Sequence, residues 1–216
     1  MNVSMVFKKK SLIPSTFFHS MSDEPQIKRP ESNQPMPSHA KLVFKGVVFD
    51  VYQWEQEMFD GSTATFEKLK RPDTVVVVPI TEAAEIIMLE EEQPGKNPFL
   101  GLPGGRIEEG ENPMDAAKRE LLEETGCVTE DWGLWKAVQP TSKIDWAIYF
   151  FIAKRCTKLK EQRLDPGERI KLKYLPFSDF LEVVTNDRFP ETDLVLEVLR
   201  AKTDPKKMQG LKDLFA

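Results

Sequence analysis

Residues 101–128, GLPGGRIEEGENPMDAAKRELLEETGCV, carry the most informative pattern in this chain. The segment opens with a loop rich in glycine and proline and continues as a helix whose limits are legible. Asn112 is suited to cap the helix, Pro113 to its first position, and Gly126 to the residue just past its end. Asp115 complements the helix dipole in the first turn. We therefore predict a glycine-rich loop that leads directly into a helix.

Three glutamates of the predicted helix share one face. Glu120, Glu123 and Glu124 stand at i, i+3 and i+4, which places their carboxylates on adjacent turns of one side. Three like charges at this spacing repel one another, whereas a divalent cation with oxygen ligands removes the repulsion. A glutamate-rich run without other signals is more simply a solvated helix face. The sequence of the preceding loop is therefore needed to distinguish a metal site from a solvated face.

That loop favours the metal-binding interpretation. Gly104 and Gly105 form a backbone without side chains, which can turn sharply and present amides or carbonyls to an ion or a phosphate. Arg119 on the helix can pair with Glu111 and so fix the loop against the helix. Apolar residues at helical spacing predict a buried stripe, made of Met114, Ala117 and Leu121.

The flanking segments predict a mixed α/β class. Strand-like runs precede the loop at residues 42–49, 51–54, 63–69, 74–80 and 86–89. The turn Asp60-Gly61-Ser62 makes the third run the return strand of a hairpin. The β-branched fourth run is typical of a strand buried on both faces, with the fifth as its partner. Three further strands and two helices are predicted after the glutamate helix, at residues 134–138, 146–153, 170–175, 177–184 and 190–202.

Composition excludes several classes of protein. The chain has 216 residues, 40% of them apolar, which fits one domain with a buried core. A net charge of −5 argues against a nucleic-acid binder, because phosphate neutralisation requires a surplus of cations. No segment approaches the roughly 20 apolar residues that span a bilayer, so no membrane partner is expected. Two cysteines, Cys127 and Cys156, are too few for a disulfide framework and indicate a reducing, cytoplasmic compartment.

Residues 1–38 are predicted to lie outside the folded domain, which we place at residues 39–216. The first 22 residues contain no acidic residue and include the run Lys8-Lys9-Lys10. A disordered tail and an organellar targeting segment both fit this composition. Proline and polar residues dominate residues 22–38, which is typical of a linker.

The spacing of charged and glycine residues resembles the Nudix box. The box reads Gly, five residues, Glu, seven residues, Arg-Glu, an aliphatic residue, any residue, Glu-Glu, any residue, Gly and an aliphatic residue. Every charged and glycine position agrees here, at Gly105, Glu111, Arg119-Glu120, Glu123-Glu124 and Gly126. Cys127 stands at the last aliphatic site, where a buried cysteine acts as a small apolar residue. The resemblance implies a Nudix α/β/α sandwich with a mixed sheet and an N-terminal β-hairpin extension.

The resemblance also implies a metal centre and its chemistry. Mg²⁺, for which Mn²⁺ can substitute, is expected on the three helical glutamates and the carbonyl of Gly105. The cation neutralises a diphosphate and activates a bound water. Arg119 and Glu123 are candidate catalytic residues, and Gly104 is a candidate contact to the substrate.

Outside the box, the chain resembles the ADP-ribose pyrophosphatase branch over residues 41–202. Residues 65–71, TFEKLKR, are similar to a motif in which an aromatic residue, a glutamate and an arginine contact the nucleotide, here Phe66, Glu67 and Arg71. Pro140 is similar to a proline of this branch. Glu168, in the sequence DPGERI, is similar to a glutamate that assists the attacking water. Core packing for Phe66 and ordinary surface positions for the charged residues are the alternatives.

Two departures from that branch bear on the substrate. Gln93-Pro94-Gly95 replaces a glutamine, an aromatic residue and an arginine that contacts phosphate, and Lys96 is the candidate replacement for that arginine. Gly101 stands where the branch often has a glutamate near the metals.

The expected partner is a small nucleotide, with ADP-ribose hydrolysed to AMP and ribose 5-phosphate. Another nucleoside diphosphate sugar or a dinucleotide is the alternative substrate, and a non-catalytic nucleotide-sensing domain is the alternative class. The branch further implies a homodimer in which the N-terminal hairpin helps to complete the neighbouring site.

Overall fold

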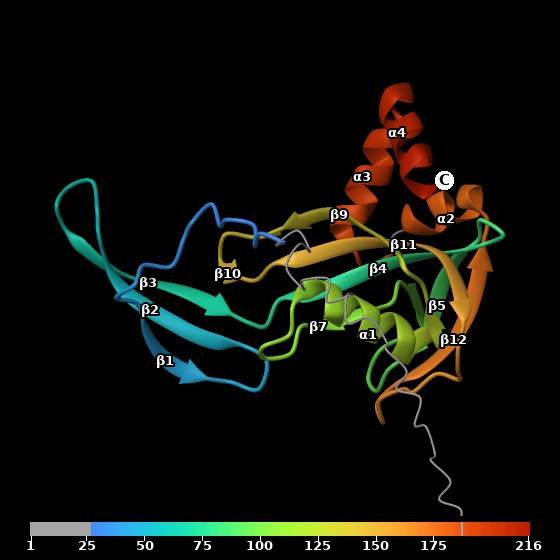
Figure 1. The fold of residues 1–216 in the computed structure, drawn as a ribbon. Coiled ribbons are helices and arrows are strands. Elements are labelled where there is room, and N and C mark those ends of the chain that lie inside the picture. The colour runs from blue at the N-terminus through green and yellow to red at the C-terminus, as the bar shows by residue number, and fades with distance from the viewer. Residues whose placement is uncertain (1–26, 187) are drawn as a thin grey trace, which may run out of the picture.

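A computed structural model of the chain describes residues 27–186 and 188–216, and it has the predicted α/β/α layers. A central mixed sheet lies between helix α1 on one side and helices α2, α3 and α4 on the other (Figure 1). The predicted targeting segment, residues 1–22, lies outside the described residues. None of the helices within the described residues is long and apolar enough to cross a membrane.

The central sheet is built around two parallel strands, β4 (Thr74–Thr81) and β11 (Ile148–Lys158). All of its other registered pairs are antiparallel. β5 (Ile86–Glu92) pairs with β12 (Arg169–Leu175) along its full length, while β8 (Cys127–Val128) and β9 (Asp131–Val138) both pair with β11. Residues Val75–Ile80 of β4 are all buried, as the β-branched run predicted.

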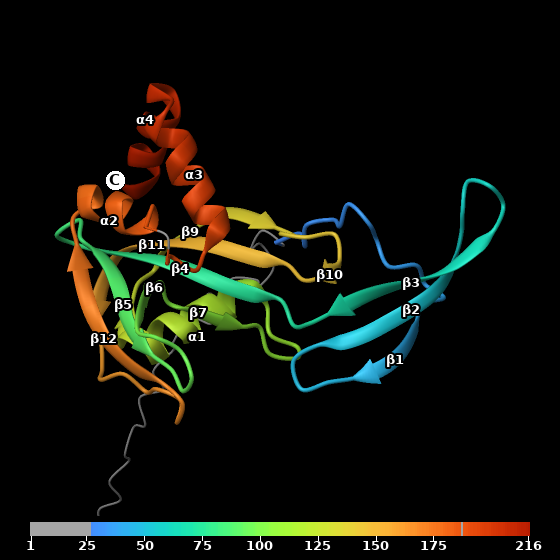
Figure 2. The ribbon, with the colours of Figure 1, turned by 180° about the vertical axis from the view of Figure 1, so that it is seen from behind.

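The predicted pairing of residues 86–89 with β4 is confirmed, because β5 is the neighbour of β4 in the sheet. The registered pairing is short, however, and consists of Ile80 and Ile86. Beyond that pair the two strands diverge, and two short strands of the glycine-rich loop pair with their edges, β6 (Phe99–Gly101) with β5 and β7 (Gly104–Arg106) with β4. The loop is therefore held by backbone hydrogen bonds between the diverging strands, beside α1 (Figure 2).

Two apolar cores fill the spaces on the two sides of the sheet. Helix α1 (Pro113–Thr125) packs Ala116, Ala117 and Leu121 against one face, and Met114 of the predicted stripe is only partly buried there. Helices α2 (Phe177–Val184), α3 (Thr192–Lys202) and α4 (Pro205–Phe215) cover the other face.

Helix α4 was not predicted from the sequence. Its polar composition and Gly210 weaken the helical pattern, although Asp204 caps it by accepting hydrogen bonds from the backbone N–H groups of Lys206 and Lys207.

A second sheet extends away from this body. It has the order β1 (Lys41–Lys45), β2 (Asp50–Glu57), β3 (Thr63–Lys70) and β10 (Ile144–Asp145), and it forms the arm in Figures 1 and 2. The predicted hairpin is confirmed by the antiparallel register of β2 with β3. The first strand is shorter than predicted, because the chain turns at Gly46, whose N–H donates to the carbonyl of Phe49 at 3.1 Å.

Residues 27–38 have no regular secondary structure but contact both sheets. Arg29 forms ion pairs with Asp73 at 2.7 Å and with Asp145 at 2.9 Å. The buried ammonium of Lys68 on β3 donates to Ser32 Oγ at 2.8 Å. This part of the predicted linker thus lies along the junction of the two sheets, and the domain boundary at residue 39 stays a prediction.

Helix α1 ends at a glycine that no other residue can replace without cost. Gly126 has a φ of 71°, and an added Cβ would overlap the carbonyl oxygen of Lys160. We expect Gly126→Ala to lower the free energy of unfolding by about 1–3 kcal/mol, because both strain and a backbone clash result. Gly133→Ala on β9 is the matched control, since a Cβ there meets no atom within 4 Å. Urea unfolding measures both variants, and equal losses would contradict the assignment.

Candidate active site

The cap of α1 fixes where its carboxylates lie. The side chain of Asn112 accepts a hydrogen bond from the Asp115 N–H at 2.9 Å, and the N–H of Gly126 donates to the Leu122 carbonyl at 2.9 Å. Both predicted ends of the helix are therefore confirmed. The side of α1 that carries the small apolar residues packs on the sheet. The side that carries the glutamates therefore faces the loop after β6.

Arg119 organises the acidic side chains around it. Its guanidinium donates to both carboxylate oxygens of Glu111, at 2.9 and 3.0 Å, as predicted from their spacing. It also donates to Glu120 at 2.8 Å and to Glu123 at 3.3 Å. A further bond to the Arg106 carbonyl at 2.9 Å ties the helix to β7. Hydrogen bonding from Arg119 lowers the pKa of Glu111.

The two loop glycines allow a very close approach of loop and helix. The N–H of Gly104 donates to Glu124 Oε2 at 2.8 Å. A Cβ added to Gly104 would overlap the backbone of Val75, and one added to Gly105 would lie 2.7 Å from the carboxyl carbon of Glu120. A side chain at position 104 would therefore push the loop off β4, and one at position 105 would displace the carboxylate of Glu120.

These groups line a cavity of about 660 Å³. Four of the five acidic residues of the predicted site, Glu120, Glu123, Glu124 and Glu168, line it together with Arg119 and the two glycines. Two cations that the sequence analysis did not single out, Arg106 and Arg163, also line it. Arg106 directly follows the paired glycines, a position that could have suggested a contact with phosphate.

Electrostatics in this cavity favour the arrival of a cation. Burial, together with the charges of Glu120, Glu91 and Glu168, raises the pKa of Glu124 to about 9, although the hydrogen bond from the Gly104 N–H opposes this shift. Burial also raises the pKa of Glu120, against the opposing effect of Arg119. Each carboxylate would be more stable in its charged form beside a positive ion.

The donor set fits a hard divalent cation. Carboxylate oxygens and a backbone carbonyl are the ligands that Mg²⁺ and Mn²⁺ prefer. Within residues 27–186 and 188–216, no three acidic, histidine or cysteine side chains converge into a preformed ion site. Two of the glutamates are engaged by Arg119 and Glu124 is engaged by Gly104, so an ion would exchange these contacts for its own.

A second cavity, of about 480 Å³, shares Gly104 and Gly105 with the first. Arg71 and Lys96, both predicted to bind substrate, line it, as does Pro140. The guanidinium carbon of Arg71 lies 4.5 Å from the centroid of the Trp146 ring. This cavity therefore combines cationic and aromatic surfaces beside the glycine loop.

Three acidic residues that line the second cavity, Glu91, Glu191 and Asp193, were not predicted as site residues from the sequence. Glu91 is buried, and burial followed by the charge of Glu168 raises its pKa to about 7. Burial raises the pKa of Glu191, before α3, to about 8, and its Oε2 atom has no hydrogen-bond partner within the described part of the chain. Glu91 could have been found from the sequence, because it is a charged residue at a position of β5 that faces the core.

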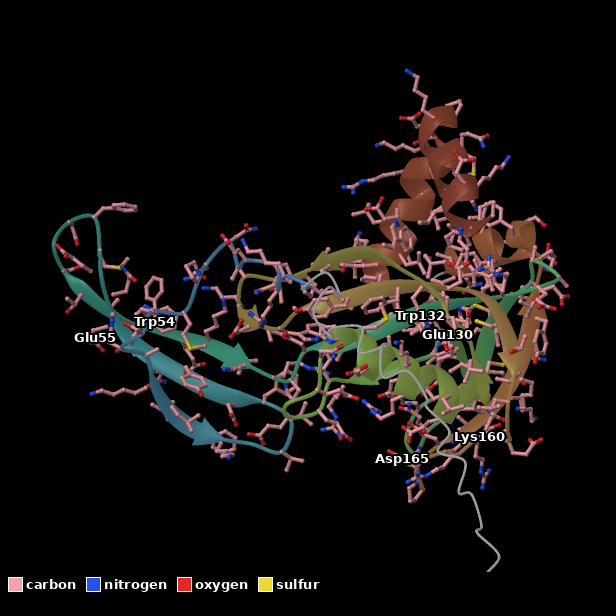
Figure 3. All side chains as sticks on the ribbon, in the orientation of Figure 1. Trp54, Glu55, Glu130, Trp132, Lys160 and Asp165 are labelled. Atoms are coloured by element: carbon pink, nitrogen blue, oxygen red, sulfur yellow. The ribbon has the colours of Figure 1, made fainter. Side chains whose placement is uncertain are left out.

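Phe66 and Glu67 do not reach either cavity within one chain. Phe66 packs across the hairpin on Trp54, with ring centroids 6.0 Å apart, and Glu67 accepts a hydrogen bond from Gln53 at 2.8 Å. Trp54 lies on the extended arm, well away from Asp165 beside the acidic cavity (Figure 3). The single chain thus separates these two residues from the other predicted site residues.

A mixed sheet between helical layers, with an acidic helix facing a glycine loop, has the architecture expected of a Nudix enzyme. The NUDIX domain family matches residues 70–195, more than half of the chain. The chain therefore belongs to the Nudix family and is a hydrolase that acts on pyrophosphate bonds.

The chain is also similar to individual members of known function. The chain is 30% identical over 145 residues to an ADP-ribose pyrophosphatase of Bacillus subtilis (strain 168), covering 66% of this chain and 78% of the relative. It is 30% identical over 160 residues to a methanol dehydrogenase activator of Bacillus methanolicus, covering 72% and 86%. A crystal structure of an ADP compounds hydrolase has the same fold, with a TM-score of 0.63 and 22% identity over 79% of this chain and 95% of the other.

Proposed function

We propose that this Nudix hydrolase is a Mg²⁺-dependent pyrophosphatase that cleaves ADP-ribose to AMP and ribose 5-phosphate. The observation that carries the proposal is the junction of the two cavities at Gly104 and Gly105. A diphosphate over these glycines has the carboxylates of α1 on one side. On the other side, the second cavity offers the nucleoside and the sugar an aromatic and cationic surface. The relative from Bacillus subtilis supports ADP-ribose as the substrate.

Each residue has a separate task in this proposal. Glu120, Glu123, Glu124 and the Gly105 carbonyl hold the divalent ion, and Arg119 positions the glutamates. The ion, when bound, neutralises the diphosphate and lowers the pKa of a coordinated water. Arg71 and Lys96 contact the substrate from the second cavity. Lys96 already has Nζ 2.7 Å from Gln93 Oε1 and 5.5 Å from the Phe99 ring centroid, so its ammonium is held at the cavity wall.

Glu168 takes the proton of the attacking water. The water oxygen forms a bond to one phosphorus while the bond from that phosphorus to the bridging oxygen breaks, and the leaving phosphate keeps the electron pair. Glu168 lines the acidic cavity, and its own loop orients it, because the Asp165 N–H donates to Glu168 Oε2 at 3.2 Å. Its separation from the helix supports a role distinct from that of the ion ligands.

The extended arm supports a homodimer. Its surface exposes a run of large apolar side chains, including Val43, Phe44 and Val47, the last of which is 97% exposed. Burying such a patch against a second copy removes it from water. The arm also holds Phe66 and Glu67, which could complete the partner's second cavity. Sedimentation equilibrium should give the mass of two chains, and a mass of one chain would contradict the dimer.

A substrate panel tests the proposed reaction. ADP-ribose, ADP- and GDP-sugars, NADH and dinucleoside polyphosphates are incubated with the enzyme and Mg²⁺, and a phosphatase reports each phosphate monoester released. We expect ADP-ribose to be hydrolysed with the highest kcat/KM, and EDTA to abolish the reaction. Preference for another compound would reassign the substrate. A silent panel with retained Mg²⁺ binding would favour the nucleotide-sensing alternative.

The variant Glu124→Gln tests whether this carboxylate is needed for catalysis and not for folding. It keeps the volume and the acceptor for the Gly104 N–H but removes the charge. We expect kcat/KM to fall at least about 100-fold, because even partners outside the metal shell cost 10- to 100-fold. Thermal unfolding without Mg²⁺ should show no loss of stability, since burial already favours the neutral form of Glu124 and the amide is neutral and of the same size.

Glu168→Gln should lower kcat more than it weakens Mg²⁺ binding, and unchanged kcat would remove Glu168 from the mechanism. Glu161→Gln, at an exposed position in the same connection before β12, is the control and should change neither quantity.

A further inference from the structure

Glu91 is a buried carboxylate that the proposed mechanism does not use. It lies on β5, where side chains alternate between the two faces of the sheet. Glu91 therefore points to the same face as Ile87, which packs in the core under α1. The side chain is only 8% exposed. A carboxylate at such a position costs stability unless hydrogen bonds or a positive charge compensate it.

The hydrogen bonds of Glu91 do not supply this compensation. Its Oε2 accepts one bond, from the neutral amide of Gln93 at 3.3 Å, and the same amide accepts from Lys96. Within residues 27–186 and 188–216, no lysine or arginine forms a salt bridge with Glu91. A neutral amide thus stands between this carboxylate and Lys96.

The second oxygen of Glu91 occupies a space that the backbone leaves open. β6 pairs with β5, and Gly101 on β6 has no side chain. A Cβ added to Gly101 would lie 3.0 Å from Glu91 Oε1. The carboxylate therefore lies where a side chain at position 101 would begin, three residues before the glycines that face α1.

Glu91 belongs to the electrostatic environment of both cavities. It lines the second cavity with Gly104 and Gly105. The charge of Glu168 contributes to the raised pKa of Glu91, and the charge of Glu91 contributes to that of Glu124. Three carboxylates thus approach the glycine loop from β5, from α1 and from the loop before β12. Such an arrangement is best compensated by a divalent cation with its water shell.

We propose that Glu91 is a positioning residue for the divalent ion, and that it reaches the ion's water shell through the space left by Gly101. The proposal rests on the proposed function, because it assumes an ion at the glutamates of α1. It assigns to β5 a part of the ion site that lies outside the box segment. Substitution of a carboxylate that holds a coordinated water or a metal ligand typically weakens metal binding by 10- to 100-fold.

Mn²⁺ binding to the substrate-free protein tests this role. Titration calorimetry is carried out on the native chain, on Glu91→Gln, and on Glu92→Gln as the control. Glu92 is the next residue along β5, but it is exposed and pairs with Arg169 at 3.6 Å. We expect Glu91→Gln to weaken Mn²⁺ binding about tenfold and Glu92→Gln to leave it unchanged. Equal affinity for the native chain and Glu91→Gln would overturn the proposal.

An exchange of the two positions separates charge placement from packing. Glu91→Gly and Gly101→Glu are made singly and together. The double variant should recover Mn²⁺ affinity to within about threefold of the native value, because it returns a carboxylate to the same space from the other strand. Glu91→Gly alone should bind as weakly as Glu91→Gln. A double variant that folds, as judged by its thermal unfolding, and binds no better than Glu91→Gly would also overturn the proposal.

The outcomes of these measurements distinguish a wrong role for Glu91 from a wrong proposed function. Native protein that binds Mn²⁺ but hydrolyses nothing in the substrate panel contradicts only the proposed function. A Glu91→Gln variant with native Mn²⁺ affinity and native turnover of ADP-ribose contradicts only the role of Glu91.

Discussion

The close approach of the glycine loop to helix α1 is the constraint on which the site depends. Gly104 pairs with Val76 on β4 while its N–H donates to Glu124, so the same residue joins the sheet, the loop and the helix. This contact exists because neither Gly104 nor Gly105 carries a side chain. The divergence of β4 and β5 provides room for the loop, and the cap at Asn112 sets the phase of the helix. The packing of α1 and the proposed catalysis therefore depend on the same few backbone contacts.

Charge balance follows from that geometry. The loop and helix bring several carboxylates into one partly buried cavity, and Arg119 compensates only some of them. Burial favours the protonated form of Glu124, and the nearby acids reinforce this preference. A divalent cation reverses the preference because it stabilises the charged form of each carboxylate. The site therefore lacks enough positive charge, and a bound divalent cation would supply it.

The sequence predicted those parts of the site that depend on local spacing. The limits of α1, the Arg119–Glu111 pair and the shared face of the glutamates are all properties of one helix and the turn before it. Contacts between distant segments were not predictable in the same way. The pairing of β6 with β5 brings Gly101 beside Glu91, ten residues earlier, and only strand register reveals it. Trp146 meets Arg71 because β10 joins the arm to the central sheet.

Phe66 shows why a motif can be read correctly for its structure while its functional role stays untested. The strand and hairpin around it were predicted from alternation and a turn, and both are present. In the proposed homodimer its place in a site depends on a second chain, which no pattern within one sequence specifies. Helix α4 illustrates the opposite case, since it was not predicted from a sequence of polar composition. Tertiary packing of Leu211 and Phe215 then stabilises a helix that local propensity does not indicate.

A crystal structure with Mn²⁺ and a non-hydrolysable analogue of ADP-ribose tests the central claim most directly. The anomalous signal of Mn²⁺ locates the ion independently of any assumption about the substrate. Our account predicts an ion bound by Glu120, Glu123, Glu124 and the Gly105 carbonyl, with the diphosphate over the two loop glycines. An ion bound elsewhere, or an analogue bound away from these glycines while Glu120 and Glu123 stay on Arg119, would contradict it.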